Sequence, residues 1–186
     1  LRRRLAKLRK ESDKKHGASK ASAMYSVQRE GAGQVVLIGG ANTGKSSLLA
    51  SLTNAAPEIG DYPYTTRLPQ PGMMPYENVN IQLVDMPPVD PNFYEPWMGS
   101  IVRQADLALL VADLDTDELL DEIDGVLRIL EDSRIRLAGE PEPLSAQSPA
   151  AFCRCFLAAN KCDSPKAPEN LEILGEFFGS RFRILA

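Results

Sequence analysis

The stretch that decides the fold is Gly39-Gly40-Ala41-Asn42-Thr43-Gly44-Lys45-Ser46, which fits the pattern G-x-x-x-x-G-K-[ST]. Residues 34–38 before it (QVVLI) form an apolar run that predicts a buried strand, and residues 46–52 after it (SSLLASL) predict a helix. A glycine loop between a strand and a helix is the setting in which this pattern binds phosphate groups. The alternative is a chance glycine-rich turn, which this setting disfavours.

The loop predicts a role for each of its residues. Its glycines allow the backbone to turn, so that successive N–H groups point at an anion. Lys45 is expected to reach the β- and γ-phosphates of a nucleotide, and Ser46 to hold Mg²⁺. The phosphate-binding residues expected from this stretch are Gly39, Ala41, Asn42, Thr43, Gly44, Lys45, Ser46 and Ser47.

A second motif indicates which nucleotide is bound. Asn160-Lys161-Cys162-Asp163 follows the apolar run at residues 156–159 (FLAA), so it is expected at the end of a strand. The carboxylate of Asp163 can accept hydrogen bonds from the ring N–H and the exocyclic amine of guanine, whereas adenine presents an acceptor in place of the ring N–H and no amine at the corresponding position. A buried polar group without a partner costs about 1–3 kcal/mol, which favours guanine. Asn160 is expected to bond the base and Lys161 to lie over its ring; the alternative is a surface turn.

Two further segments complete the predicted site. Residues 79–85 (VNIQLVD) predict a strand that ends in Asp85, the position at which a carboxylate holds Mg²⁺ beside the glycine loop. Residues 61–66 (DYPYTT) lie in the preceding loop, where a threonine can bind Mg²⁺ and sense the γ-phosphate. We favour Thr66 over Thr65 for this role. The alternative for both threonines is an ordinary polar loop.

On these residues the chain resembles the TRAFAC GTPases of the Obg/DRG superfamily, and is most similar to the DRG (developmentally regulated GTP-binding protein) branch. Residues 5–11 (LAKLRKE) resemble the basic helix that precedes the GTPase domain in that branch, and residues 134–137 (RIRL) resemble the segment after its third helix. The resemblance covers nearly the whole chain. It implies a Mg²⁺-dependent, slow GTPase acting in ribosome- or RNA-linked processes, with Lys45, Thr66 and Asn42 as its catalytic residues.

The chain departs from this family at the second switch. The expected D-x-x-G reads Asp85-Met86-Pro87-Pro88 here, and Pro88 has no N–H to donate to a γ-phosphate. We therefore expect a weaker difference between the GTP and GDP states. Val89 stands where Ras-like enzymes carry a water-orienting Gln, so no side chain in this segment is an evident base.

Asn42 has two interpretations. In several relatives an Asn at this position of the loop binds a potassium ion that lies against the phosphates. The resemblance therefore makes K⁺ a candidate second cation beside Mg²⁺. The alternative is that Asn42 only tolerates a turn geometry, as Asn often does.

Composition bounds the class of protein. A chain of 186 residues with 44% hydrophobic residues can form one domain with a buried core, plus an extension. No apolar run of about 18 residues and no apolar signal stretch is present, so we expect no membrane contact and a cytoplasmic location. Cys153 and Cys155 share one face of a predicted strand and, with Cys162, lack a zinc spacing; we expect reduced thiols. His16 is the single histidine.

Charge is distributed unevenly along the chain. Residues 1–30 hold ten Lys or Arg and three Asp or Glu, a net charge of +7, whereas residues 31–186 carry −11. A basic arm on an acidic domain is typical of proteins that contact a polyanion, with RNA the natural candidate. The alternative is a solvated helix that docks on the domain through Leu1, Leu5 and Leu8.

The coarse pattern predicts a three-layer α/β P-loop fold with a mostly parallel sheet. We assign residues 1–32 to a basic helical extension (helix 1–15) and linker, and 33–186 to the GTPase domain. Residues 138–150 form a proline-rich insertion. The resemblance implies that the guanine-closing loop and a TGS domain would follow Ala186, so the domain is expected to be incomplete. Strands are expected at 34–39, 68–75, 79–85, 107–113, 152–159 and 182–186, and helices at 45–54, 94–104, 117–132 and 168–179.

Two other functions compete with a GTPase. A guanine-nucleotide-binding interaction module with little hydrolysis is compatible with Pro88. A P-loop kinase of small molecules is disfavoured by Asn160 to Asp163 and by the lack of an arginine-rich lid.

Overall fold

A computed structural model describes residues 25–55, 68–140 and 150–186. The expected helix at 1–15, both threonines at 65–66 and most of the insertion at 138–150 lie outside these residues. The described part alternates strands with helices, as expected. Its elements are β1 Gly33–Ile38, α2 Lys45–Leu52, β2 Gln70–Tyr76, β3 Val79–Asp85, α3 Pro96–Gln104, β4 Leu107–Asp113, α4 Leu119–Asp132, β5 Ile135–Ala138, β6 Ala151–Asn160, α5 Ala167–Phe178 and β7 Arg183–Leu185.

The strands form one sheet in the order β2-β3-β1-β4-β6-β5, with β7 also paired to β6. All pairs are parallel except β2 with β3, which form an antiparallel hairpin at one edge. Because β1, β3, β4 and β6 are parallel, their carboxyl ends meet at one edge of the sheet, the usual place of a ligand site. The prediction of a mostly parallel sheet is confirmed.

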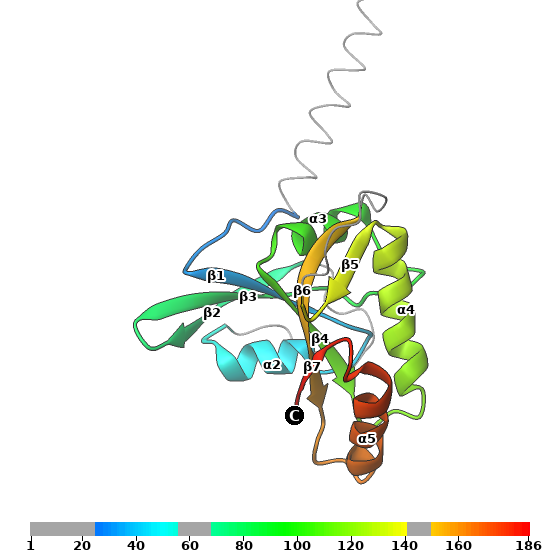
Figure 1. Ribbon diagram of the computed structural model, residues 1–186. Coiled ribbons are helices and arrows are strands. Elements are labelled where there is room, and N and C mark those ends of the chain that lie inside the picture. The colour runs from blue at the N-terminus through cyan, green and yellow to red at the C-terminus, as the bar shows by residue number, and fades with distance from the viewer. Residues whose placement is uncertain (1–24, 56–67, 141–149) are drawn as a thin grey trace, which may run out of the picture.

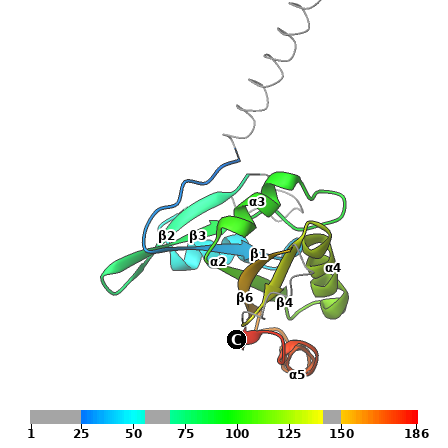
Figure 2. The same ribbon diagram turned by 45° about the horizontal axis from the view of Figure 1, so that its top comes forward.

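Helices cover both faces of the sheet, which gives three layers (Figures 1 and 2). On one face, α3, α4 and α5 pack on alternate residues of β1, β3, β4 and β6, among them Val36, Val84, Leu110 and Leu157. On the other face, Leu49 of α2 packs with Leu37 and Leu83. Burial of this apolar surface is the main stabilising contribution to the fold.

Each expected strand and helix that falls within the described residues has both ends within two residues of its predicted bounds. The one described strand that the sequence did not predict is β5, a four-residue strand that pairs with the start of β6. Cys153 and Cys155 lie in the core as predicted, and burial raises their thiol pKa values to about 11 and about 12. No helix in the described ranges is both long and apolar enough to cross a membrane.

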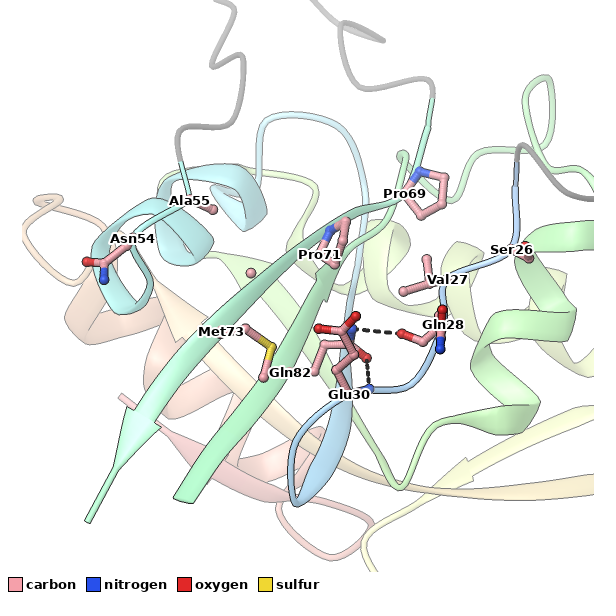
Figure 3. Close-up of a pocket in the computed structure, with 11 residues that line it drawn as sticks. Ser26, Val27, Gln28, Glu30, Asn54, Ala55, Pro69, Pro71, Met73 and Gln82 are labelled. Carbon is pink, nitrogen blue, oxygen red and sulfur yellow. Dashed lines mark hydrogen bonds between the residues drawn. The ribbon is translucent and has the colours of Figure 1, made fainter. Parts of the chain in front are cut away.

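Residues 25–30, which we call the strap, pack against the surface of the domain. The ring of Tyr25 stacks on Trp97 of α3, with centroids 4.6 Å apart, and Arg29 pairs with the carboxylate of Asp106. The buried side chain of Gln82 accepts a hydrogen bond from Gln34 at 2.7 Å and donates to the carbonyl of Gln28 at 2.9 Å. A hollow of about 560 Å³ opens between the strap and β2 (Figure 3). These contacts hold residues 25–30 against α3, β3 and the start of β4.

Candidate functional site

The phosphate loop joins β1 to α2, as the sequence predicts, and its shape depends on two glycines. Gly39 has φ 151° and Gly44 has φ 92°, which are conformations that other residues rarely adopt. A Cβ atom on Gly44 would lie 2.1 Å from the side-chain nitrogen of Asn160, and one on Gly39 would lie 2.5 Å from the carbonyl oxygen of Val111. Glycine is required at both positions because neighbouring strands approach the loop closely.

Lys45 lies inside the loop, and its side chain is 6% exposed. Its ammonium group donates to the carbonyl oxygens of Gly39, at 3.3 Å, and Gly40, and to the hydroxyl of Thr43 at 3.3 Å. Burial lowers the pKa of Lys45 to about 8, although the nearby charges of Asp85 and Glu122 act to raise it. A desolvated cation held by carbonyls at the mouth of a glycine loop is suited to binding an anion.

Ser46 and Asp85 meet beside the loop, so two of the three predicted magnesium ligands are adjacent. The Ser46 hydroxyl donates to Oδ2 of Asp85 at 2.5 Å, and Asp85 is fully buried. Burial raises the pKa of Asp85, against the hydrogen bond from Ser46 and the charge of Lys45.

The other oxygen of the same carboxylate, Oδ1 of Asp85, is buried and has no hydrogen-bond partner within the described chain. A hydroxyl and a carboxylate with one unsatisfied oxygen are hard donors that suit Mg²⁺, which commonly takes only one or two protein ligands and completes its shell with phosphate and water. Among the described residues no group of three or more His, Cys, Asp or Glu could hold a metal alone. The donor set fits Mg²⁺ shared with a nucleotide.

The second motif lies against the first. Asp113 and Asn160 are register partners at the ends of β4 and β6. The side-chain amide of Asn160 donates to the carbonyl oxygen of Thr43 at 2.8 Å, across 117 positions of sequence. The phosphate loop and the Asn160–Asp163 segment therefore lie in direct contact.

Other residues of this segment occupy a turn after β6. Lys161 has φ 61° and forms an ion pair with Asp113, which is 8% exposed, while Cys162 and Asp163 face solvent. Sequence reasoning missed Asp113, although its place at the end of an apolar strand, like that of Asp85, is the signal that could have identified it. Its pairing with Lys161 holds that side chain beside the site.

Nearby polar contacts hold the turn. Ser164 donates to the carboxylate of Asp115, and Asn170 of α5 donates to the carbonyl oxygens of Leu114 and Thr116 at 2.9 and 3.0 Å. These contacts join the turns that follow β4 and β6. They hold the chain next to the exposed Asp163 in place.

The segment after Asp85 is packed into the domain. Residues 86–89 are all buried, and Met86 and Val89 belong to the core of the α3 side. The N–H of Met86 donates to the carbonyl oxygen of Leu37 at 3.2 Å, and that of Val89 donates to Gly39 at 3.0 Å. The first backbone N–H after Pro88 is thus bonded to the phosphate loop itself.

The remaining predicted residues differ in placement. Ala41 is half-buried in the loop, Asn42 is exposed with φ 59°, and Ser47 is exposed in the first turn of α2. Thr66 lies outside the described residues. Glu122 of α4, which the sequence did not single out, lies near the loop: its carboxylate oxygen would be 3.8 Å from a Cβ on Gly40. The pKa of Glu122 is raised, mainly by burial and to a smaller extent by the charge of Asp113.

Comparison with known proteins identifies the class of this site. Residues 34–139, more than half of the chain, match the family described as 50S ribosome-binding GTPase. The chain belongs to this family of GTP-binding proteins. Its curated relatives include developmentally regulated GTP-binding proteins, so the resemblance to the Obg/DRG type is confirmed.

Three relatives illustrate the similarity. A GTP-binding protein of Halobacterium salinarum is 32% identical over 79% of this chain and 40% of its own length. A developmentally regulated GTP-binding protein 1 homolog of Dictyostelium discoideum is 31% identical over 78% and 41%, and the human mitochondrial ribosome-associated GTPase 2 is 30% identical over 81% and 35%. The chain thus spans roughly two fifths of the length of the relatives it matches.

Solved structures share the fold at lower identity. NFeoB from S. thermophilus bound to GDP·AlF4⁻ and K⁺ has a TM-score of 0.57 and 20% identity, covering 83% of this chain and 54% of that one. Era in complex with MgGDPNP and part of 16S ribosomal RNA has a TM-score of 0.58 and 19% identity, covering 82% and 49%. These likenesses confirm the P-loop GTPase fold.

The close approach of Asn160 to Gly44 gives a direct test of the site's geometry. Gly44→Ala should lower the free energy of unfolding by about 2 kcal/mol, because alanine is strained at positive φ and its Cβ displaces the Asn160 amide. Gly40→Ala is the matched control: its Cβ would meet no atom closer than 3.7 Å. Urea unfolding of both variants measures the difference. Equal stability of the two would contradict this geometry.

Proposed function

We propose that this chain binds GTP and GDP with Mg²⁺ and hydrolyses GTP slowly, as a switch in ribosome- or RNA-linked processes. The observation that carries the proposal is the hydrogen bond from Asn160 to the Thr43 carbonyl, which unites a phosphate loop and a guanine motif. Single-turnover hydrolysis of GTP, with and without ribosomes, tests it. A chain that binds guanine nucleotide but turns over none in either condition would contradict the hydrolytic part.

Each residue has a part in this proposal. Backbone N–H groups of residues 39–47 cradle the phosphates, and Lys45 leaves its carbonyl partners to neutralise the β- and γ-phosphates. Ser46, Asp85 and Thr66 would hold Mg²⁺, which supplies charge neutralisation to the phosphates when it is bound. The catalytic contribution of the protein is positioning and electrostatics, because no side chain near Val89 is an evident base.

Guanine selection would come from the turn after β6. Asp163 accepts hydrogen bonds from the base, Asn160 steadies both the base and the loop, and Lys161 covers the ring. Asp163 is exposed, so its carboxylate is accessible to a base.

A ribosomal or RNA partner is supported by three observations. The family is described as ribosome-binding, the human relative is mitochondrial ribosome-associated, and Era has been crystallised with 16S ribosomal RNA. In this chain, residues 1–30 carry a net charge of +7, which suits phosphate groups. We propose contact through this arm and a cytoplasmic location.

Pro88 favours a second candidate function, a guanine-nucleotide-binding interaction module with little hydrolysis. Pro88 offers no N–H, and the N–H of Val89 is bonded to Gly39, so the segment presents no backbone donor to a γ-phosphate at either residue. A buried segment of this kind would change little between nucleotide states.

The guanine motif predicts a specific change in base preference. Asp163→Asn should weaken GDP binding by about 100-fold, because the amide cannot accept both hydrogen bonds, and should favour xanthosine diphosphate, whose carbonyl can accept from the new amide. Glu169→Gln, an exposed carboxylate of α5, is the control with the same change of charge. Titration with GDP and xanthosine diphosphate measures the preference; unchanged GDP affinity would exclude the role of Asp163.

The second switch predicts a change in the preference between nucleotide states. Pro88→Gly should raise the ratio of GTP to GDP affinity by about tenfold, since it supplies one backbone hydrogen bond to a γ-phosphate. Pro87→Gly, one residue earlier in the same buried segment, controls for added backbone freedom. Calorimetric titration gives both ratios. Identical ratios in the parent chain and in Pro88→Gly would refute this effect.

Asn42 predicts a dependence on the monovalent cation. Asn42→Gly keeps the positive φ of 59° without strain and removes the amide oxygen, so it separates a potassium ligand from a turn residue. We expect the parent chain to hydrolyse GTP faster in K⁺ than in Na⁺ at equal ionic strength, and Asn42→Gly to lose that difference. If the two proteins respond to K⁺ and Na⁺ in the same way, Asn42 serves only as a turn residue.

A further inference from the structure

A hollow of about 330 Å³ opens at the edge of the sheet, away from the phosphate loop. There β5 and β7 pair in turn with the same side of β6: Ala138 is the register partner of Arg154, and Arg183 that of Phe156 (Figure 1). We call this hollow the arginine notch. It is lined by the side chains of Arg154, Phe156, Arg181 and Arg183. Four residues of β6, or about 13 Å, separate Phe156 from Asn160 of the nucleotide site.

Two guanidinium groups of the arginine notch lie over one aromatic ring, that of Phe156. The guanidinium carbon of Arg154 lies 5.9 Å from the centre of the Phe156 ring, and that of Arg183 lies 5.7 Å from it. Arg154 and Phe156 are two positions apart on one strand and so point to the same face. Phe156 is half-buried, whereas Arg154 and Arg183 are exposed. The notch therefore offers a ring and cations together.

The three arginines differ in how well their charges are satisfied. Arg181 donates to the carbonyl oxygen of Leu137 at 3.1 Å and pairs with Glu131 at 3.1 Å. Arg154 pairs with Glu140 at 2.8 Å.

The guanidinium group of Arg183 has only the ring as a partner within residues 25–55, 68–140 and 150–186. The notch thus holds one surplus cation, in a part of the chain whose net charge is −11 over residues 31–186. An anionic group would complete it.

We propose that the arginine notch binds a nucleotide of single-stranded RNA, with the base stacked beside Phe156 and its phosphate paired with Arg183. Aromatic stacking combined with arginine–phosphate pairing is how proteins hold single-stranded RNA. A volume of about 330 Å³ suits one such unit. An acidic peptide would satisfy Arg183, but its Asp and Glu side chains carry no aromatic base to stack on the ring. This site deepens the RNA partner of the proposed function and rests on it.

The test uses the full chain, saturated with GDP and Mg²⁺, and a labelled single-stranded RNA of about ten nucleotides. Fluorescence anisotropy should show binding that Arg183→Gln weakens about tenfold and Phe156→Leu weakens about fivefold. The matched control is Arg128→Gln, which removes the same charge from an exposed position of α4 and should weaken binding less than about twofold. Thermal unfolding checks that each variant is folded. If Phe156→Leu is unstable, Arg183→Gln alone is used to test the site.

Several outcomes would overturn the site. Equal losses of RNA affinity in Arg183→Gln and Arg128→Gln would show that binding depends on overall charge and not on the notch. If a poly-glutamate peptide competes as well as RNA does, the notch would be assigned to an acidic protein partner. A chain with Lys7, Arg9 and Lys10 changed to Gln separates the arm from the notch. If this arm variant loses RNA binding while Arg183→Gln keeps it, RNA remains the partner and the notch is excluded as its binding site. GDP affinity on the same samples tests nucleotide binding separately and should not change in Arg183→Gln.

Discussion

The amide of Asn160 and the carbonyl oxygen of Thr43 make the contact on which the candidate site depends. It is possible only because β1 and β6 both pair in parallel with β4, so that the segments following them emerge at one edge of the sheet. Gly44 has no side chain, and this allows the approach. The segments proposed to bind the phosphates and the base are therefore joined by a direct hydrogen bond.

The same edge carries two buried charged groups. Within the described residues, Lys45 is a desolvated cation that donates to two carbonyls and a hydroxyl, and Asp85 is a buried carboxylate with one oxygen that has no hydrogen-bond partner. Both groups carry a desolvation cost that phosphate and a divalent cation would offset. The segment at residues 86–89 differs, since its backbone is bonded to Leu37 and Gly39 and its side chains are buried. Lys45 and Asp85 are thus suited to a nucleotide and its cation, whereas residues 86–89 are packed into the domain.

Much of this arrangement could be predicted from the sequence, because it is encoded in local patterns. The glycine loop, the apolar run of β4 and the carboxylate that ends β3 each identify their element and its ligand edge. The strand β5 was missed because four residues are too few to show a period, and it is stabilised by pairing with Ala151–Arg154 far along the chain. The strap and the Lys161–Asp113 pair could not be predicted, since they depend on side-chain contacts between distant segments.

The proposed function requires one site to recognise phosphate and guanine together. Calorimetric titration of the full chain with GDP, GTP and ATP in the presence of Mg²⁺ tests this requirement. We expect both guanine nucleotides to bind at least about 100-fold more tightly than ATP, because adenine leaves the Asp163 carboxylate unpaired. Equal affinity for ATP and GTP would show that the loop binds phosphate without reading the base, and would refute the proposed guanine recognition.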